Sequence, residues 1–100
     1  MRHKLTAYCY DKRGRLIASA SNDYSRTHPL QKHFAELVGR PEAIYLHAEI
    51  AALVRCGGKK PYTISIERYL KDGTPALAKP CSICERAIKA FGIKRVIYTM

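Results

Sequence analysis

Two short fragments, distant in the sequence, place a histidine and two cysteines at the beginnings of two predicted helices. The first is Leu46-His47-Ala48-Glu49 and the second is Lys79-Pro80-Cys81-Ser82-Ile83-Cys84. Cys81 and Cys84 are three residues apart, so they share one face of a helix. One imidazole and two thiolates are common zinc ligands. If all three bind one ion, the two helices lie side by side with their N-terminal ends together, and this constrains the fold.

The three candidate ligands, His47, Cys81 and Cys84, leave one position of a tetrahedral zinc ion open. Catalytic zinc sites keep that position for water, whereas structural sites have four protein ligands. Cys56 is the nearest candidate for a fourth ligand. It follows His47 by nine residues on the same predicted helix, about 13 Å along the axis, which is too far for one ion. Cys9 lies in an apolar predicted strand and is expected to be a small buried residue.

Glu49 follows the histidine by two residues and supplies a carboxylate for proton transfer. Zinc lowers the pKa of bound water towards about 7. A neighbouring carboxylate then accepts the water proton and passes protons to the substrate. Partial positive charge at helix N-termini also lowers thiol pKa values and favours thiolate ligands. The sequence therefore predicts a catalytic zinc centre in which Glu49 handles protons.

Length and charge limit the class of protein and its partners. One hundred residues predict one domain, 1–100, with a modest core. The net charge of +10 favours an anionic partner, either a nucleotide or a nucleic acid; the alternative reading is solubility with loose polyanion affinity. No apolar run is long enough to cross a membrane, and the N-terminus does not resemble a signal peptide. A Cys-x-x-Cys pair in a chain without a recognisable secretion signal favours metal binding in a reducing compartment, so a cytoplasmic location is expected.

The hydrophobic pattern predicts an α/β fold. Strands are expected over 5–10, 16–20, 62–69 and 95–99, and helices over 29–38, 46–56 and 80–91, with a polar loop over 21–28. Pro80 is expected to open the last helix, in which Cys84, Ala87, Ile88 and Phe91 face inward. The order β-β-α-α-β-α-β requires a parallel crossover in its second half. We therefore expect a three-layer structure with a mixed four-stranded sheet.

The combination of His-x-Glu with Pro-Cys-x-x-Cys, in this order and separation, resembles the cytidine deaminase superfamily along the whole chain. The resemblance implies Zn²⁺ as cofactor, and two zinc helices packed on a mixed sheet. His47 stands where deaminases of free cytidine usually have cysteine, and so resembles the branch of deoxycytidylate, guanine, tRNA adenosine and polynucleotide cytidine deaminases. The stretch Thr-His-Pro-Leu-Gln at 27–31, followed by Tyr-Leu-His-Ala-Glu at 45–49, most resembles the sequences of small deoxycytidylate-deaminase-like proteins, many of them phage-encoded.

Four residues are expected to contact the substrate. The resemblance implies that Asn22, after the second strand, contacts the sugar, although asparagine is also an ordinary turn residue. It also implies that backbone groups near Ala48 hold the base. His28 lies in a predicted loop that borders the pocket or is simply structural. Tyr24 lies in the same loop, where an exposed aromatic ring can stack on a base.

The leading hypothesis is a zinc-dependent hydrolytic deaminase of a cytosine-containing nucleotide or nucleoside, with deoxycytidylate as the expected substrate. The first alternative is a polynucleotide deaminase acting on tRNA adenosine or single-strand cytidine. The second is a zinc-stabilised nucleic-acid-binding module without catalysis, which would have no need of Glu49. The family core normally continues into a fifth strand after the last strand found here. Its absence leaves a sheet edge that a second subunit can cover, so a homo-oligomer is expected.

Overall fold

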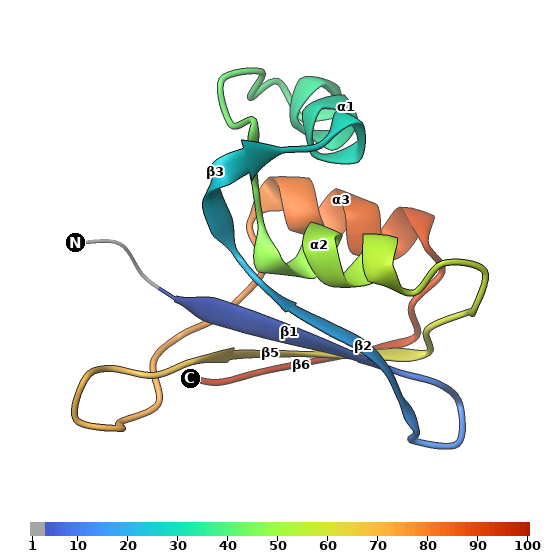
Figure 1. Ribbon diagram of the computed structural model, residues 1–100, viewed down its shortest axis with the longest axis vertical. Coiled ribbons are helices and arrows are strands. Elements are labelled where there is room, and N and C mark those ends of the chain that lie inside the picture. The colour runs from blue at the N-terminus through green and yellow to red at the C-terminus, as the bar shows by residue number, and fades with distance from the viewer. Residues whose placement is uncertain (1–3) are drawn as a thin grey trace.

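The computed structural model describes residues 4–100, except for the side chain of Tyr24. The strands are β1 (Leu5–Tyr10), β2 (Leu16–Ser21), β3 (Asp23–Thr27), β4 (Tyr45–Leu46), β5 (Thr63–Arg68) and β6 (Arg95–Tyr98). The helices are α1 (Pro29–Leu37), α2 (Ala48–Arg55) and α3 (Ser82–Ala90). The four predicted strands and three predicted helices therefore all occur, in the predicted order, as Figure 1 shows.

The main sheet is mixed, as predicted, with the order β2-β1-β5-β6. β1 is antiparallel to both β2 and β5, so that Tyr8 lies between Ser19 and Ser65. β5 and β6 are parallel, and α3 forms the crossover between them. β6 thus has one neighbour in the sheet, and its outer edge has no strand beside it in the part of the chain that the structure describes.

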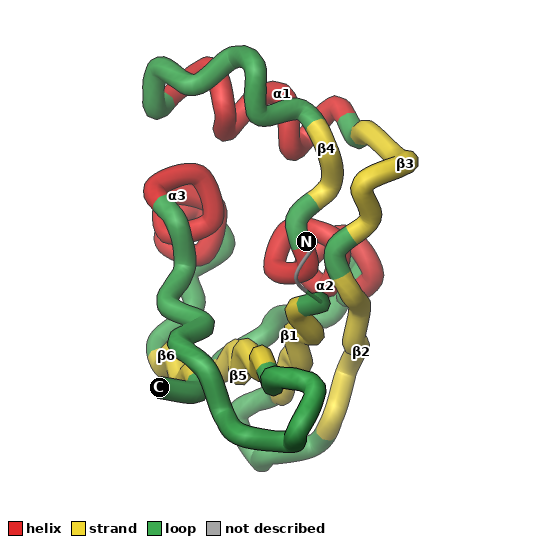
Figure 2. The backbone as a smooth tube through the Cα atoms, turned by 90° about the vertical axis from the view of Figure 1, so that its left-hand side faces the viewer, coloured by secondary structure: helices red, strands yellow, loops and turns green. Residues whose placement is uncertain are grey.

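The elements form three layers, as Figures 1 and 2 show. The main sheet is the first layer, α2 and α3 lie side by side on one of its faces, and α1 with the β3–β4 ribbon lies beyond them. The core forms between the sheet and the two inner helices. Its largest fully buried apolar side chains are Ile50, Leu53, Ile64, Ile66 and Ile83. This packing fixes the N-terminal ends of α2 and α3 together at one end of the sheet.

The prediction of a loop over 21–28 is wrong, because residues Asp23–Thr27 form strand β3. β3 pairs with the two-residue strand β4, whose second residue, Leu46, was predicted as the first residue of the helix over 46–56. α2 itself starts at Ala48, since the backbone of His47 is extended, with φ −78° and ψ 152°. Pairing with a distant segment gives a polar stretch a strand conformation that local sequence signals do not show.

Two further predictions about α3 are wrong in detail. Pro80 does not open the helix; it precedes Cys81, which is the N-cap. Phe91 was expected to face inward, but it is the C-cap residue and is exposed. The helix ends here, because Gly92, with φ +73°, begins the loop that leads from α3 into β6.

No helix within residues 4–100 has the length and apolar character needed to cross a membrane.

Candidate metal and catalytic site

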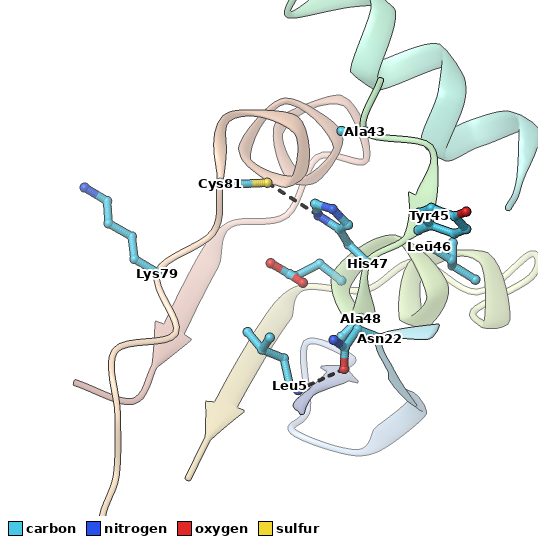
Figure 3. Close-up of a pocket in the computed structure, with 10 residues that line it drawn as sticks. Leu5, Asn22, Ala43, Tyr45, Leu46, His47, Ala48, Lys79 and Cys81 are labelled. Carbon is cyan, nitrogen blue, oxygen red and sulfur yellow. Dashed lines mark hydrogen bonds between the residues drawn. The ribbon is translucent and has the colours of Figure 1, made fainter. Parts of the chain in front are cut away.

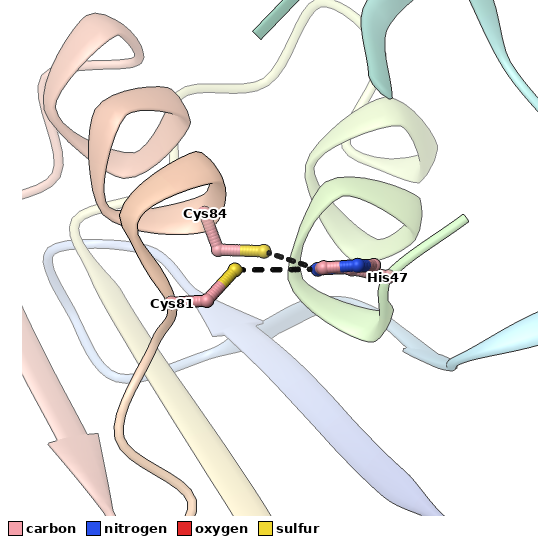
Figure 4. A group of neighbouring side chains, drawn as sticks. All are labelled: His47, Cys81 and Cys84. Atoms are coloured by element: carbon pink, nitrogen blue, oxygen red, sulfur yellow. Dashed lines mark hydrogen bonds between the residues drawn. The ribbon is translucent and has the colours of Figure 1, made fainter. Parts of the chain in front are cut away.

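Two helix N-termini position the three candidate ligands. His47 is the N-cap of α2 and Cys81 is the N-cap of α3, and neither side chain caps its own helix by a hydrogen bond. Cys84 lies one turn into α3 and is buried. Because the N-cap side chains are not used on the backbone, both are directed across the gap between the helices, where Figure 4 shows the three side chains converging.

The Nδ1 atom of His47 lies 3.2 Å from Sγ of Cys84 and 3.5 Å from Sγ of Cys81. The three ligand atoms all lie within 4.8 Å of one another. Tetrahedral bonds of about 2.3 Å to sulfur and about 2.0 Å to nitrogen place such atoms about 3.5 Å apart. The three residues therefore fit a zinc ion with Nδ1 as the histidine ligand. Cys56 is not in this group; it lies at the C-terminal end of α2, as predicted.

Hydrogen bonds within the group control its protons. The hydrogen bond with Cys84 is the main cause that lowers the pKa of Cys81, and the ring of His47 lowers it further. The same bond, followed by burial and the Glu49 carboxylate, raises the pKa of Cys84. The hydrogen bond with Cys81 raises the pKa of His47. The Cys81 thiolate is thus stabilised by its neighbours, whereas Cys84 favours the protonated thiol while no metal is bound.

Glu49 lies in the first turn of α2, beside the three candidate ligands. Its side chain is only 5% exposed, and burial raises its pKa above the ordinary value. A hydrogen bond with the Cys84 thiol and the charge of His47 act in the opposite direction. Glu49 also lines the cavity next to the ligands. A buried carboxylate at this position can exchange protons with a molecule in the cavity.

Gln31 supports the site from α1 and was not predicted from the sequence. Its side chain is 0% exposed. Its Nε2 donates to the carbonyl oxygen of Ala43 at 3.1 Å, and its Oε1 accepts the backbone N–H of His47 at 3.1 Å. The sequence gives little signal for this role, because a glutamine in an amphipathic helix is usually solvent-facing.

A cavity of about 340 Å³ opens beside the candidate ligands, as Figure 3 shows. His47, Ala48, Glu49 and Cys81 form the wall on the ligand side. Asn22 and Leu5 also line the cavity, and Figure 3 shows Asn22 close to Ala48. The Oδ1 atom of Asn22 accepts the N–H of Leu5 at 3.0 Å, and this bond fixes the orientation of the amide at the cavity wall. The structure therefore brings two of the four predicted substrate contacts, Asn22 and Ala48, together with the candidate ligands.

The other two predicted substrate contacts lie elsewhere or outside the described residues. His28 is the N-cap of α1, and its Nδ1 accepts the N–H of Leu30 at 3.0 Å. It lines a separate hollow beside β3 and α2 and not the cavity next to the ligands. The side chain of Tyr24 is not among the described parts of the structure. Lys79 and Tyr45, which the sequence did not single out, do line the cavity.

Comparison with known families agrees with this geometry. Residues 1–100 match the family described as the cytidine and deoxycytidylate deaminase zinc-binding region. The fold and the His-Cys-Cys group thus define a zinc-dependent deaminase. The chain belongs to the cytidine and deoxycytidylate deaminase family. No individual curated protein matches it significantly.

Proposed function

We propose that the chain is a hydrolytic deaminase that converts deoxycytidylate to its uracil form and releases ammonia. The observation that carries this proposal is the buried carboxylate of Glu49, which lines the same cavity as His47 and Cys81. A purely structural zinc site needs no such carboxylate. In this proposal His47, Cys81 and Cys84 hold the zinc ion and Glu49 is the catalytic residue.

The reaction needs a base and an acid at one place. A bound zinc ion supplies Lewis-acid activation of water and lowers its pKa to about 7. Glu49 accepts the proton of the attacking water, whose oxygen bonds to the ring carbon that carries the amine. Glu49 passes this proton to the ring nitrogen, then takes the remaining proton of the new hydroxyl group and delivers it to the amine nitrogen. The carbon–nitrogen bond breaks, ammonia leaves, and a carbonyl replaces the amine. The burial that raises the pKa of Glu49 favours this return of protons.

Two features support a nucleotide as substrate. The cavity volume of about 340 Å³ is at the small end of ligand sites, which suits one pyrimidine nucleotide and not a longer strand. Lys79 has an exposed side chain at the rim of this cavity, where an ammonium group can meet a phosphate. Asn22 and the backbone near Ala48 are then the proposed contacts for the sugar and the base.

Ammonia release from a panel of substrates tests the proposal. The panel is deoxycytidylate, deoxycytidine, guanine, adenosine and short cytosine-containing single strands, each offered to the wild type and to Glu49→Gln. We expect turnover of deoxycytidylate, loss of turnover in Glu49→Gln with zinc retained, and full activity in the control Glu85→Gln, an exposed residue on α3. Equal activity of wild type and Glu49→Gln would exclude the mechanism. Preference for the single strands would favour the polynucleotide deaminase, to which the charge of +10 also points.

We also propose that the protein is a homo-oligomer and that it is cytoplasmic. The edge strand β6 exposes Val96 and Ile97, which favours a homo-oligomer that covers them. All four cysteines are free thiols, which suits the reducing cytoplasm. Light scattering of the purified protein measures the oligomer directly.

A further inference from the structure

A groove of about 520 Å³ lies at the end of the molecule where α2 and α3 terminate. Three lysines from three different loops line it: Lys12 from the β1–β2 turn, Lys60 from the α2–β5 loop and Lys94 from the α3–β6 loop. Two aromatic side chains, Tyr62 and Phe91, share the groove, and each is 38% exposed. The groove thus combines cationic groups with partly exposed aromatic rings.

The backbone around the groove is tied together at Tyr62. Its N–H donates to the carbonyl oxygen of Tyr10 at 2.8 Å. Its own carbonyl oxygen accepts the N–H of Lys94 at 2.9 Å and the N–H of Arg95 at 3.1 Å. Three chain segments are therefore held in register at this point, and the groove is part of the fold and not a gap between independent loops.

Positive charge at this end extends beyond the groove and is poorly compensated. Arg13 and Arg15 lie in the β1–β2 turn, Lys59 in the α2–β5 loop, Lys89 near the end of α3, and Arg95 at the start of β6. The carboxylate of Asp11 in the same turn already accepts the N–H groups of Arg13 and Arg15 at 2.9 Å each. The one ion pair found among the described residues joins Arg26 and Asp23, far from the groove in the chain. Asp11 is the only carboxylate in the β1–β2 turn, the α2–β5 loop and the α3–β6 loop, so cationic side chains outnumber anionic ones there and attract a polyanion.

We propose that this groove binds single-stranded nucleic acid. Phosphates contact the three lysines, and bases stack on Tyr62 and Phe91, which is how single strands bind without sequence preference. The groove lies at the opposite end of α2 from His47, and eight helical residues separate the two ends by about 12 Å. A base stacked there is outside the cavity beside His47, so the groove anchors a strand independently of the proposed reaction.

Fluorescence anisotropy with labelled twelve-residue oligothymidine tests the groove in the full-length protein. Thymine carries no exocyclic amine, so the deaminase site has nothing to act on. The groove variant is Lys12→Ala/Lys60→Ala/Lys94→Ala. The matched control, Lys4→Ala/Lys32→Ala/Lys71→Ala, removes the same charge from exposed residues elsewhere. Circular dichroism during heating checks that both variants fold as the wild type does.

We expect the groove variant to bind at least about tenfold more weakly than the wild type, with the slope of log K against log salt reduced by about 2 for three lost phosphate contacts. Tyr62→Leu/Phe91→Leu, which keeps all charges, should weaken binding by about fivefold through lost stacking. Equal weakening in the groove variant and the control would overturn the proposal, because only total charge would then matter. A protein that binds vesicles containing anionic lipid but does not bind oligothymidine would also overturn the proposal, and would indicate that the groove contacts a membrane surface.

Discussion

The side chain of Gln31 accepts the backbone N–H of His47 at 3.1 Å, from a fully buried position on α1. The same amide donates to the carbonyl of Ala43, so it ties both ends of the segment that leads into α2. His47 is extended at the N-cap and has no side-chain cap bond of its own. The α1 layer therefore fixes the backbone from which the histidine ligand projects.

Gln31→Met tests this relationship, because methionine keeps the volume and removes both hydrogen bonds. A buried N–H or C=O left unpaired costs about 1–3 kcal/mol. Loss of a group that orients a metal ligand lowers affinity by about 10- to 100-fold. We expect zinc affinity, measured by competition with a chromophoric chelator, to fall in that range. The exposed neighbour variant Lys32→Ala is the control, and unchanged zinc affinity in Gln31→Met would show that the contact is only structural.

Thiol reactivity should distinguish Cys81 from the other cysteines. Burial and a hydrogen bond with Cys56 raise the pKa of Cys9 from 9.0 to about 12, and burial raises the pKa of Cys56. The pKa of Cys81 is lowered in the metal-free group. After treatment with a chelator, we expect iodoacetamide to label Cys81 first and to leave Cys9 and Cys56 unlabelled in the native protein.

The pH dependence of that labelling has a defined sign. Because only the thiolate reacts, labelling of Cys9 in the folded protein should keep rising through pH 10 towards about 12, whereas in urea it should level off above pH 9. Peptide mass spectrometry locates the label. Rapid labelling of Cys9 at neutral pH in the folded protein would contradict the buried pair.

His28 offers a separate test, because the sequence left open whether it contacts the substrate or has only a structural role. Its Nδ1 caps α1 through the N–H of Leu30. Replacing a capping residue with alanine costs about 1 kcal/mol, and asparagine restores a cap. We expect His28→Ala to lower the free energy of unfolding by about that amount, His28→Asn to recover it, and both to keep the wild-type KM. A raised KM in both variants would instead support the substrate contact.

The residues of the candidate site were readable from the sequence for a chemical reason. Histidine and cysteine are common zinc ligands, and the Cys-x-x-Cys spacing and the starts of helices can be recognised from short local patterns. The burial of Gln31 was not readable, because it depends on Ala43 and His47, which reach it only in the folded chain. The prediction that Phe91 faces inward was wrong for a related reason. Helical spacing assigns every apolar residue in register to the core, including one at the C-cap that the fold leaves exposed.

The fold shows the same division between local and distant causes. The four main strands and three helices follow from hydrophobic period and glycine stops, and Gly39, Gly57 and Gly92 all have positive φ just after a helix. The pairing of β3 with β4 does not follow from such signals, since β4 has two residues and the register is irregular. Only the docking of α1 over the inner helices brings those two segments together.

The proposal that the substrate carries a phosphate can be tested at Lys79. Its exposed side chain lies at the rim of the cavity that Glu49 lines. A hydrogen bond to a charged group contributes about 1.5–3 kcal/mol, which corresponds to about tenfold or more in binding. We expect Lys79→Met to raise the KM for deoxycytidylate by about tenfold and to leave the turnover of deoxycytidine unchanged, because that substrate lacks the phosphate. Lys71→Met, on an exposed turn, is the matched control. An equal change for both substrates would mean that Lys79 shapes the cavity and does not contact a phosphate.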